Sequence, residues 1–249
     1  MRNFLYLFFL LTSTLHAQEE NIRYPLWFLE TGRVACQHIA VGYATLSPYL
    51  NNSVIAAKKN AVNNYLRLKQ YSVKGGQAFW KTERGVVSEG NNIRESFDTT
   101  SLSALITSTV VLDSFFTKDI VSVIIEHSDC AFSKKFGNAL NIKEETQPPW
   151  VTSIPNEKGF IHQIGSSEGF YREISSWERA EKNARLYLAR AVGKITIQSR
   201  GHSSAKSANE VQNEEMVAIV KNAEIVARWR DVKKNIFYVL ARCPSLMKK

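Results

Sequence analysis

The run from Gly165 to Gly169, which reads Gly-Ser-Ser-Glu-Gly, is the most specific chemical motif in the chain. It matches the G-x-S-x-G pattern, in which a nucleophilic serine sits on a tight turn between a strand and a helix. That chemistry needs an acid and then a histidine later in the chain. The only later histidine is His202, and Asp231 follows it, which is the wrong order. We therefore expect a protein that is not an enzyme and assign no catalytic residue.

Cysteine and histidine form a second set that could carry chemistry. Cys36 with His38, and His127 with Cys130, supply the ligand types of a tetrahedral zinc site if the strands that bear them are neighbours. Thiols of an exported protein tend to oxidise, so a disulfide between Cys36 and Cys130 is the preferred interpretation. Cys243 would then stay unpaired. The alternative, in which all three cysteines are small buried hydrophobic residues, remains open. We predict no metal and no cofactor.

A third set alternates cations with an aromatic ring. Arg228, Trp229 and Arg230 form a candidate interaction surface of the kind that contacts carbohydrate or anionic lipid. The same alternation is typical of an edge strand with two different faces. No glycine-rich phosphate loop or dinucleotide fingerprint is present in the sequence.

The first 17 residues have the three parts of a secretory signal peptide. Arg2 supplies the positive charge, residues 4–11 form an apolar run, and Ala17 is the small residue before the expected cut. The run is too short to span a bilayer, and no second long apolar stretch follows it. We therefore expect an exported chain in the periplasm, at the outer membrane or outside the cell, with no transmembrane span after cleavage.

The formal net charge of +9 bears on the choice of partner. A basic exported protein is attracted to anionic lipid or cell-wall polymer. Charge that only maintains solubility is the simpler interpretation. Nucleic acid is not an expected partner, because export separates the chain from it.

Residues 24–68 recur later in the chain at one constant offset, and this repeat indicates the elements that carry the motifs. The matching pairs are Trp27 with Trp150, Gly42 with Gly165, Ser53 with Ser176, and residues 57–61 with 180–184. Chance rarely keeps Trp, Gly and an Ala-x-Lys-Asn-Ala core in one register. The sequence therefore predicts two copies of one module.

Each copy has one clear helix, predicted at 53–68 and at 176–192. Small or apolar residues recur there three or four positions apart and form one stripe, which includes Ala61 and Ala184. Small residues in the middle of the stripe would let each helix pack close to a sheet. Ser175 fits the first position of a capping box at the start of the second helix.

The later part of each copy predicts a second helix, at 102–115 and at 210–221. The first copy then ends in a strand at 120–126, and the second ends in a hairpin formed by 224–229 and 237–242. The fold class is therefore α+β, with two tandem modules, each a small, mostly antiparallel sheet packed by an Ala-lined helix. The expected division is a signal peptide at 1–17, a first module at 24–130, a linker at 131–147 and a second module at 148–243.

Parts of the second copy resemble the LPP20 lipoprotein family. The resemblance covers about residues 148–243, and the first copy, 24–130, resembles a degenerate second module of that kind. The segments that carry it are 149–151 through 165–167, 180–185, 226–229 and 238–242. The resemblance implies an exported bacterial envelope or surface protein, in some members connected with flagella and motility, and it implies no catalytic residues. This chain lacks a lipobox cysteine at the end of its signal segment, so lipid anchoring is not carried over.

We therefore expect a non-enzymatic exported cell-envelope protein that acts as an interaction or scaffold module. It would associate with the outer membrane, the cell surface or the flagellar apparatus, and its partners would be envelope or surface proteins. The alternative is a binding protein for an anionic envelope polymer or glycan. The shape of the main groove discriminates between them, because a basic groove with aromatic rings favours polymer and an exposed apolar surface favours protein.

Overall fold

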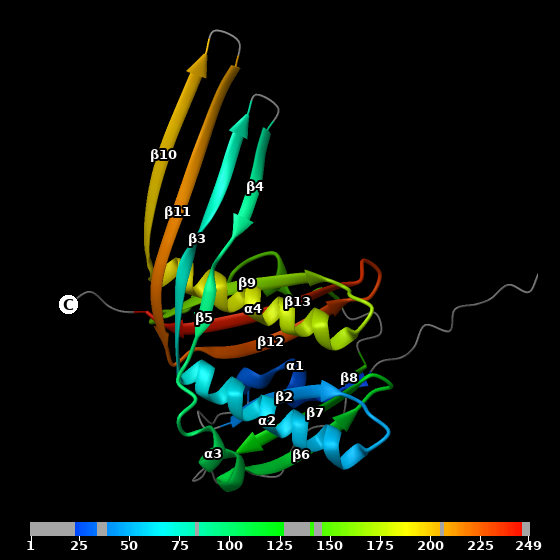
Figure 1. The fold of residues 1–249 in the computed structure, drawn as a ribbon. Coiled ribbons are helices and arrows are strands. Elements are labelled where there is room, and N and C mark those ends of the chain that lie inside the picture. The colour runs from blue at the N-terminus through cyan, green and yellow to red at the C-terminus, as the bar shows by residue number, and fades with distance from the viewer. Residues whose placement is uncertain are drawn as a thin grey trace, which may run out of the picture.

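The computed structural model describes residues 23–33, 39–82, 85–126, 140–141, 146–204 and 207–245. The fold is α+β with antiparallel sheets, so the predicted fold class is confirmed. Figure 1 shows two helix-covered sheets, one above the other, and a long β-structure that extends away from them. The signal segment 1–17, most of the linker 131–147, and both Cys36 and Cys130 lie outside the described residues, so the disulfide stays a prediction.

The first half forms a three-stranded sheet covered by one long helix. The strand order is β2 (Ile39–Thr45), β7 (Ile120–Glu126), β6 (Val110–Phe116). Helix α2 (Leu50–Lys69) lies against β2 and β7. Every residue of β7 from Ile120 to Ile125 is buried, as expected for the central strand of a covered sheet.

The second half has the same arrangement of equivalent elements. Its strand order is β9 (Phe160–Glu168), β13 (Ile236–Pro244), β12 (Glu224–Asp231), with α4 (Glu173–Val192) on β9 and β13. In both halves the first strand of the half pairs with its last strand. The two three-stranded sheets therefore have the same strand order, and one long helix covers each of them.

The alanine stripe brings each helix unusually close to its sheet. Ala61 and Ala184 are fully buried, as predicted. A Cβ placed on Gly42 would lie 2.1 Å from the backbone nitrogen of Ala61, and one on Gly165 would lie 2.1 Å from the carbonyl oxygen of Ala180. The two glycines are needed because the helix backbone occupies the space that any side chain would take.

A five-stranded sheet, here called the arm, joins the two halves. Its order is β10 (Lys194–Ser204), β11 (Ser207–Lys221), β3 (Gln70–Thr82), β4 (Gly85–Asn91), and β5 (Arg94–Ser96) also pairs with β3. Strands β3 and β11 come from different halves and pair from Gln70 with Lys221 to Lys81 with Glu210. The halves are therefore linked through a continuous sheet, which extends well beyond the body in Figure 1.

Two helix predictions are wrong. Residues 210–221 lie in β11, because Met216, Ala218 and Val220 alternate toward the core and the backbone pairs with strands on both sides. Residues 102–115 contain only a short helix, α3 (Leu102–Ser108), followed by β6. In both segments strand pairing overrides a local pattern that a helix also satisfies, with distant β3 in the first case and with β7 of the same hairpin in the second.

The helices begin earlier than predicted, and the matched serines act differently from caps. Ser53 Oγ accepts the backbone N–H of Ser47 at 2.8 Å, and Ser176 Oγ accepts that of Phe170 at 2.8 Å. Both serines lie inside the first turns of α2 and α4, and no side-chain cap is formed at the N-cap of α4. The predicted capping box at Ser175 is therefore wrong, and the repeated serine fixes the loop before each helix.

The segment at residues 23–33, here called the opening segment, fills the space between the halves. It comprises β1 (Arg23–Tyr24), which pairs with β8 (Leu140–Asn141), then α1 (Leu26–Leu29) and the 3-10 turn η1 (Thr31–Arg33). Tyr24 and Phe28 are buried and pack edge-on against Trp177 of α4. The equivalent position of the second half holds the short turn η2 (Pro149–Val151), which contains no buried residue. The opening segment and η2 therefore differ in burial despite their shared tryptophan.

Candidate functional site

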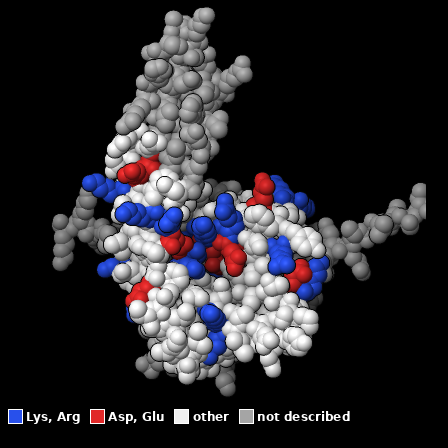
Figure 2. All heavy atoms as spheres, viewed as in Figure 1, with Lys and Arg blue, Asp and Glu red and all other residues white. Residues whose placement is uncertain are grey.

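A chain of ion pairs crosses the seam between the two halves. Figure 2 shows charged side chains gathered in a band across the middle of one face, below the arm. At its buried end, Arg228 Nη2 lies 2.6 Å from Glu181 Oε1, and Arg228 Nη1 donates to the carbonyl oxygen of Phe28 and to Thr31 Oγ1, both at 2.8 Å. Strand β12, helix α4 and the opening segment are thereby joined at one point.

The series of ion pairs continues toward the arm through one carboxylate that two arginines share. Arg185 donates from two nitrogens to Glu95 of β5, at 2.8 and 3.2 Å, and Arg67 of α2 lies 3.2 Å from the same carboxylate. Burial lowers the pKa of Arg185, but the neighbouring Glu95 and Glu181 together with Tyr43 outweigh burial, so the net pKa is raised. Burial and the nearby Arg185 lower the pKa of Arg67. These ion pairs therefore connect the arm to both α2 and α4.

A cavity of about 500 Å³ lies beside these ion pairs and is lined by residues of both halves. Its four arginines all lie next to carboxylates: Arg228 is paired with Glu181, Arg242 with Glu224 at 2.9 Å, and Arg185 and Arg67 share Glu95. Buried charges of this kind need partners, and these have them within the protein. We therefore assign the ion pairs the structural role of fastening the halves together.

The predicted interaction surface at Arg228, Trp229 and Arg230 is wrong for its first two residues. Arg228 is 4% exposed and Trp229 is 8% exposed. Arg228 is held by the ion pair with Glu181, and Trp229 packs beside Tyr238 with ring centroids 5.5 Å apart. The opening segment packs against β12 and covers the face that carries Arg228. The alternating pattern could not reveal that cover.

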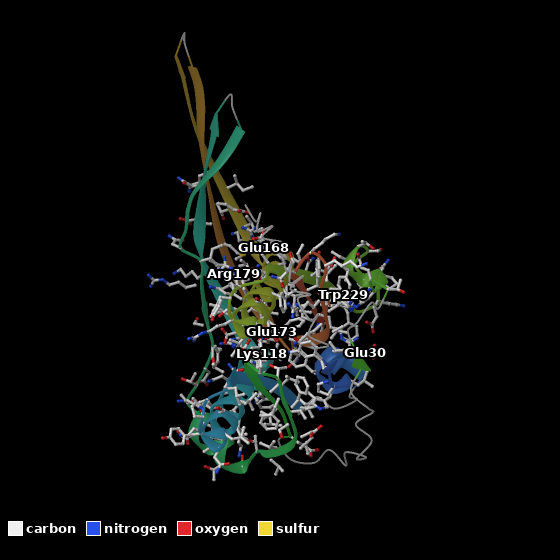
Figure 3. The ribbon with its side chains drawn as sticks, turned by 90° about the vertical axis from the view of Figure 1, so that its right-hand side faces the viewer. Glu30, Lys118, Glu168, Glu173, Arg179 and Trp229 are labelled. Carbon is white, nitrogen blue, oxygen red and sulfur yellow. The ribbon has the colours of Figure 1, made fainter. Side chains whose placement is uncertain are left out.

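Arg230 instead contributes to a groove at the end of the molecule where the strand-connecting loops meet. This loop-end groove has a volume of about 660 Å³. It is lined by Thr45, residues 115–119, residues 170–173, Arg230, Asn235 and Phe237. Both halves therefore contribute to it. Figure 3 looks onto this end and shows Lys118 and Glu173 next to one another between the two sheets.

The loop-end groove is lined by both aromatic rings and charged side chains. Phe116 is 42% exposed, Phe170 is 54% exposed and Tyr171 is fully exposed. Three cationic side chains and two carboxylates stand among these rings. The cations are Lys118, Arg172 and Arg230, and the carboxylates are Asp119 and Glu173. This site was not among the sequence predictions, although a signal was present: the aromatic pair Phe170-Tyr171 lies outside any periodic apolar pattern.

The base of the arm exposes apolar residues on both of its faces. Ile195 and Ile197 of β10 lie on one face, and Val217 and Ile219 of β11 lie on the other, and all four are exposed. Strand β10 is the last strand in the sheet order, so its outer edge has no paired strand within the described part of the chain. Residues 195–199 contain neither proline nor charge, the usual protection of an edge strand.

The remaining candidate chemical residues are not brought together. Residues 165–168 of the hydrolase-like motif belong to the continuous strand β9, not to a strand–helix turn, and Gly165 faces α4. Cys243 is buried, and burial raises the pKa of its thiol. His162 is buried near Glu157, 3.4 Å away, and burial lowers its pKa. No group of three or more potential metal ligands occurs among the described residues, and the proposed cysteine–histidine ligands lie outside them.

The chain matches no family model, no curated protein and no solved structure. The LPP20 resemblance and the location it implies therefore stay proposals. Within the part of the chain that the structure describes, no helix combines the length and the apolar character needed to cross a bilayer.

Proposed function

We propose that this protein is a non-enzymatic, exported cell-envelope protein that acts as an interaction or scaffold module. The observation that carries the proposal is the arm. It extends beyond the packed body, exposes Ile195, Ile197, Val217 and Ile219, and ends in the open edge of β10. Exposed apolar residues on a projecting sheet cost solubility, so their presence is typical of a surface that contacts a partner.

The rigid attachment of the arm supports the same role. Strand β5 is held by the bonds between Glu95 and Arg185, and β3 is anchored where the Tyr71 hydroxyl donates to the carbonyl oxygen of Arg185 at 2.8 Å. A surface whose position is fixed before binding loses less entropy when it binds. A partner held on the arm would therefore be fixed relative to the body.

Site-specific photocrosslinking in the native envelope tests this proposal. A photoreactive residue at Ile197 should give discrete covalent adducts with an envelope or surface protein. The matched control is Ile55, an exposed isoleucine on the outer face of α2, which should give none. Equal labelling from both positions, or no adduct from Ile197, would contradict the proposal.

A second candidate function is binding of an anionic envelope polymer or glycan, and the loop-end groove favours it. This function uses the loop-end groove and does not require the arm. The two candidates can therefore be tested by separate variants of the same protein.

A further inference from the structure

We propose that the loop-end groove binds a sugar chain that carries anionic groups. This deepens the second candidate function above by naming its site and ligand class, and it does not depend on partner binding by the arm. The proposal rests on three features of the groove: exposed rings, mixed charged groups, and walls that are already held in place.

The exposed rings supply the stacking surface. Phe116, Phe170 and Tyr171 line the groove and are exposed to solvent, whereas Phe237 is a buried lining residue. The apolar C–H face of a pyranose ring packs against an aromatic face, and this contact buries area with little loss of side-chain freedom. A groove of about 660 Å³ is within the roughly 300–1,000 Å³ range of ligand sites, which suits a few sugar rings.

The charged groups match the remaining chemistry of such a ligand. The carboxylate of Asp119 accepts hydrogen bonds from sugar hydroxyls. Arg172 and Arg230 supply cations that pair with carboxylate or phosphate groups on the sugar. Arg230 is already oriented: its guanidinium lies 4.7 Å from the centre of the Phe237 ring and donates to Asn235 Oδ1 at 3.0 Å. Its Nε is buried and has no hydrogen-bond partner in the protein.

The walls of the groove are held by backbone hydrogen bonds across the loops. Gly169 N donates to the carbonyl oxygen of Asn235 at 2.7 Å, and Phe170 N donates to Ser176 Oγ at 2.8 Å. On the opposite wall, Leu46 N donates to the carbonyl oxygen of Asp119 at 2.9 Å. A groove held in this way is largely formed before the ligand arrives, which lowers the entropy cost of weak individual contacts.

The groove suits a sugar chain better than a lipid surface. It is concave, and a flat membrane would leave its floor uncovered. A sugar chain can instead enter the groove, where its hydroxyl groups can donate to the carboxylate of Asp119.

Saturation-transfer NMR and calorimetry on the full protein test the proposal with trigalacturonate as the anionic probe and maltotriose as the neutral one. We expect binding of trigalacturonate that is about tenfold tighter than that of maltotriose, as one added charge contact would produce. The double variant Phe170→Ser/Tyr171→Ser should lower the affinity for trigalacturonate by about tenfold or more. Because both side chains are exposed, its melting temperature should stay unchanged, which separates lost binding from lost folding.

The matched control is Tyr49→Ser. Tyr49 is exposed in the loop of the first half that corresponds to residues 170–172, and it does not line the groove. It should bind trigalacturonate as the wild type does. No saturation transfer from trigalacturonate, or equal loss in the control and the double variant, would overturn the proposal. Binding to phosphatidylglycerol vesicles without trigalacturonate binding would overturn it in favour of a membrane surface. Loss of arm crosslinking at Ile197 would leave it standing, so the two functions fail separately.

Discussion

Replacing Arg228 with methionine should destabilise the protein strongly, because the side chain joins three elements at a buried point. The guanidinium donates to Glu181 Oε1 from two nitrogens, at 3.0 and 2.6 Å, and also to the carbonyl oxygen of Phe28 and to Thr31 Oγ1. Its removal leaves the buried carboxylate of Glu181 without its closest partner and removes the shorter of two hydrogen bonds to the carbonyl oxygen of Phe28. Breaking a buried pair in this way costs roughly 3–5 kcal/mol.

The expected value lies near the lower end of that range. Arg185 Nη1 remains 3.8 Å from Glu181 Oε2 and compensates part of its charge. Methionine also retains much of the apolar contact of the arginine stem. We therefore expect a loss of about 3 kcal/mol in the free energy of unfolding of Arg228→Met. Urea unfolding followed by circular dichroism measures it, provided that the slope with urea stays constant.

A double-mutant cycle separates this pair from a general loss of packing. Glu181→Met should also destabilise, but Arg228→Met/Glu181→Met should recover much of the loss, because no buried charge is then left alone. The control is Lys234→Met, which breaks a surface pair 3.7 Å long in which Lys234 is exposed, and its cost should be about 0.5 kcal/mol or less. Losses in the two single variants that simply add in the double variant would refute the coupling.

Two further predictions concern the second half. Gly165→Ala should lower the free energy of unfolding by roughly 3 kcal/mol, because the new methyl group would push α4 away from β9. Ser166→Ala, on the exposed face of the same strand, should leave stability unchanged and serves as the control. Similar melting temperatures of the two variants would contradict this prediction. Burial lowers the pKa of His162 in the folded protein, although Glu157 opposes this shift. The unfolded chain therefore binds the proton more tightly than the folded protein does, so stability should fall as the pH drops below 6.5. Arg242 and Glu224 also act on His162, and His162→Gln should flatten that part of the stability profile, as urea midpoints at several pH values would show.

The parts of the fold that sequence patterns predicted are those that depend on local spacing. The stripe through Ala61 and Ala184 specified two helices, and the structure shows that these helices approach their strands at Gly42 and Gly165. These signals work because side chains three or four positions apart share one helix face, whatever lies elsewhere in the chain. The α+β class followed from the same periodicities.

The misassigned segments show where local spacing stops being informative. Residues 210–221 carry apolar side chains that fit either a helix or a strand, and pairing with β3, far away in the sequence, decided for the strand. Arg228 and Trp229 looked like two faces of an open strand, but the opening segment covers one of them. In both cases the deciding contact comes from a segment that the local pattern does not contain.

The sequence by itself determined the two Ala-lined helices and the α+β class. Only the tertiary structure decided that the halves share an arm, that Arg228 is part of a buried ion-pair chain, and that Phe116 meets Phe170 and Tyr171 across one groove. The physical reason is range. A helix face is set by neighbours a few residues apart, whereas a sheet shared by two halves and a groove between loops exist only after distant segments have packed together.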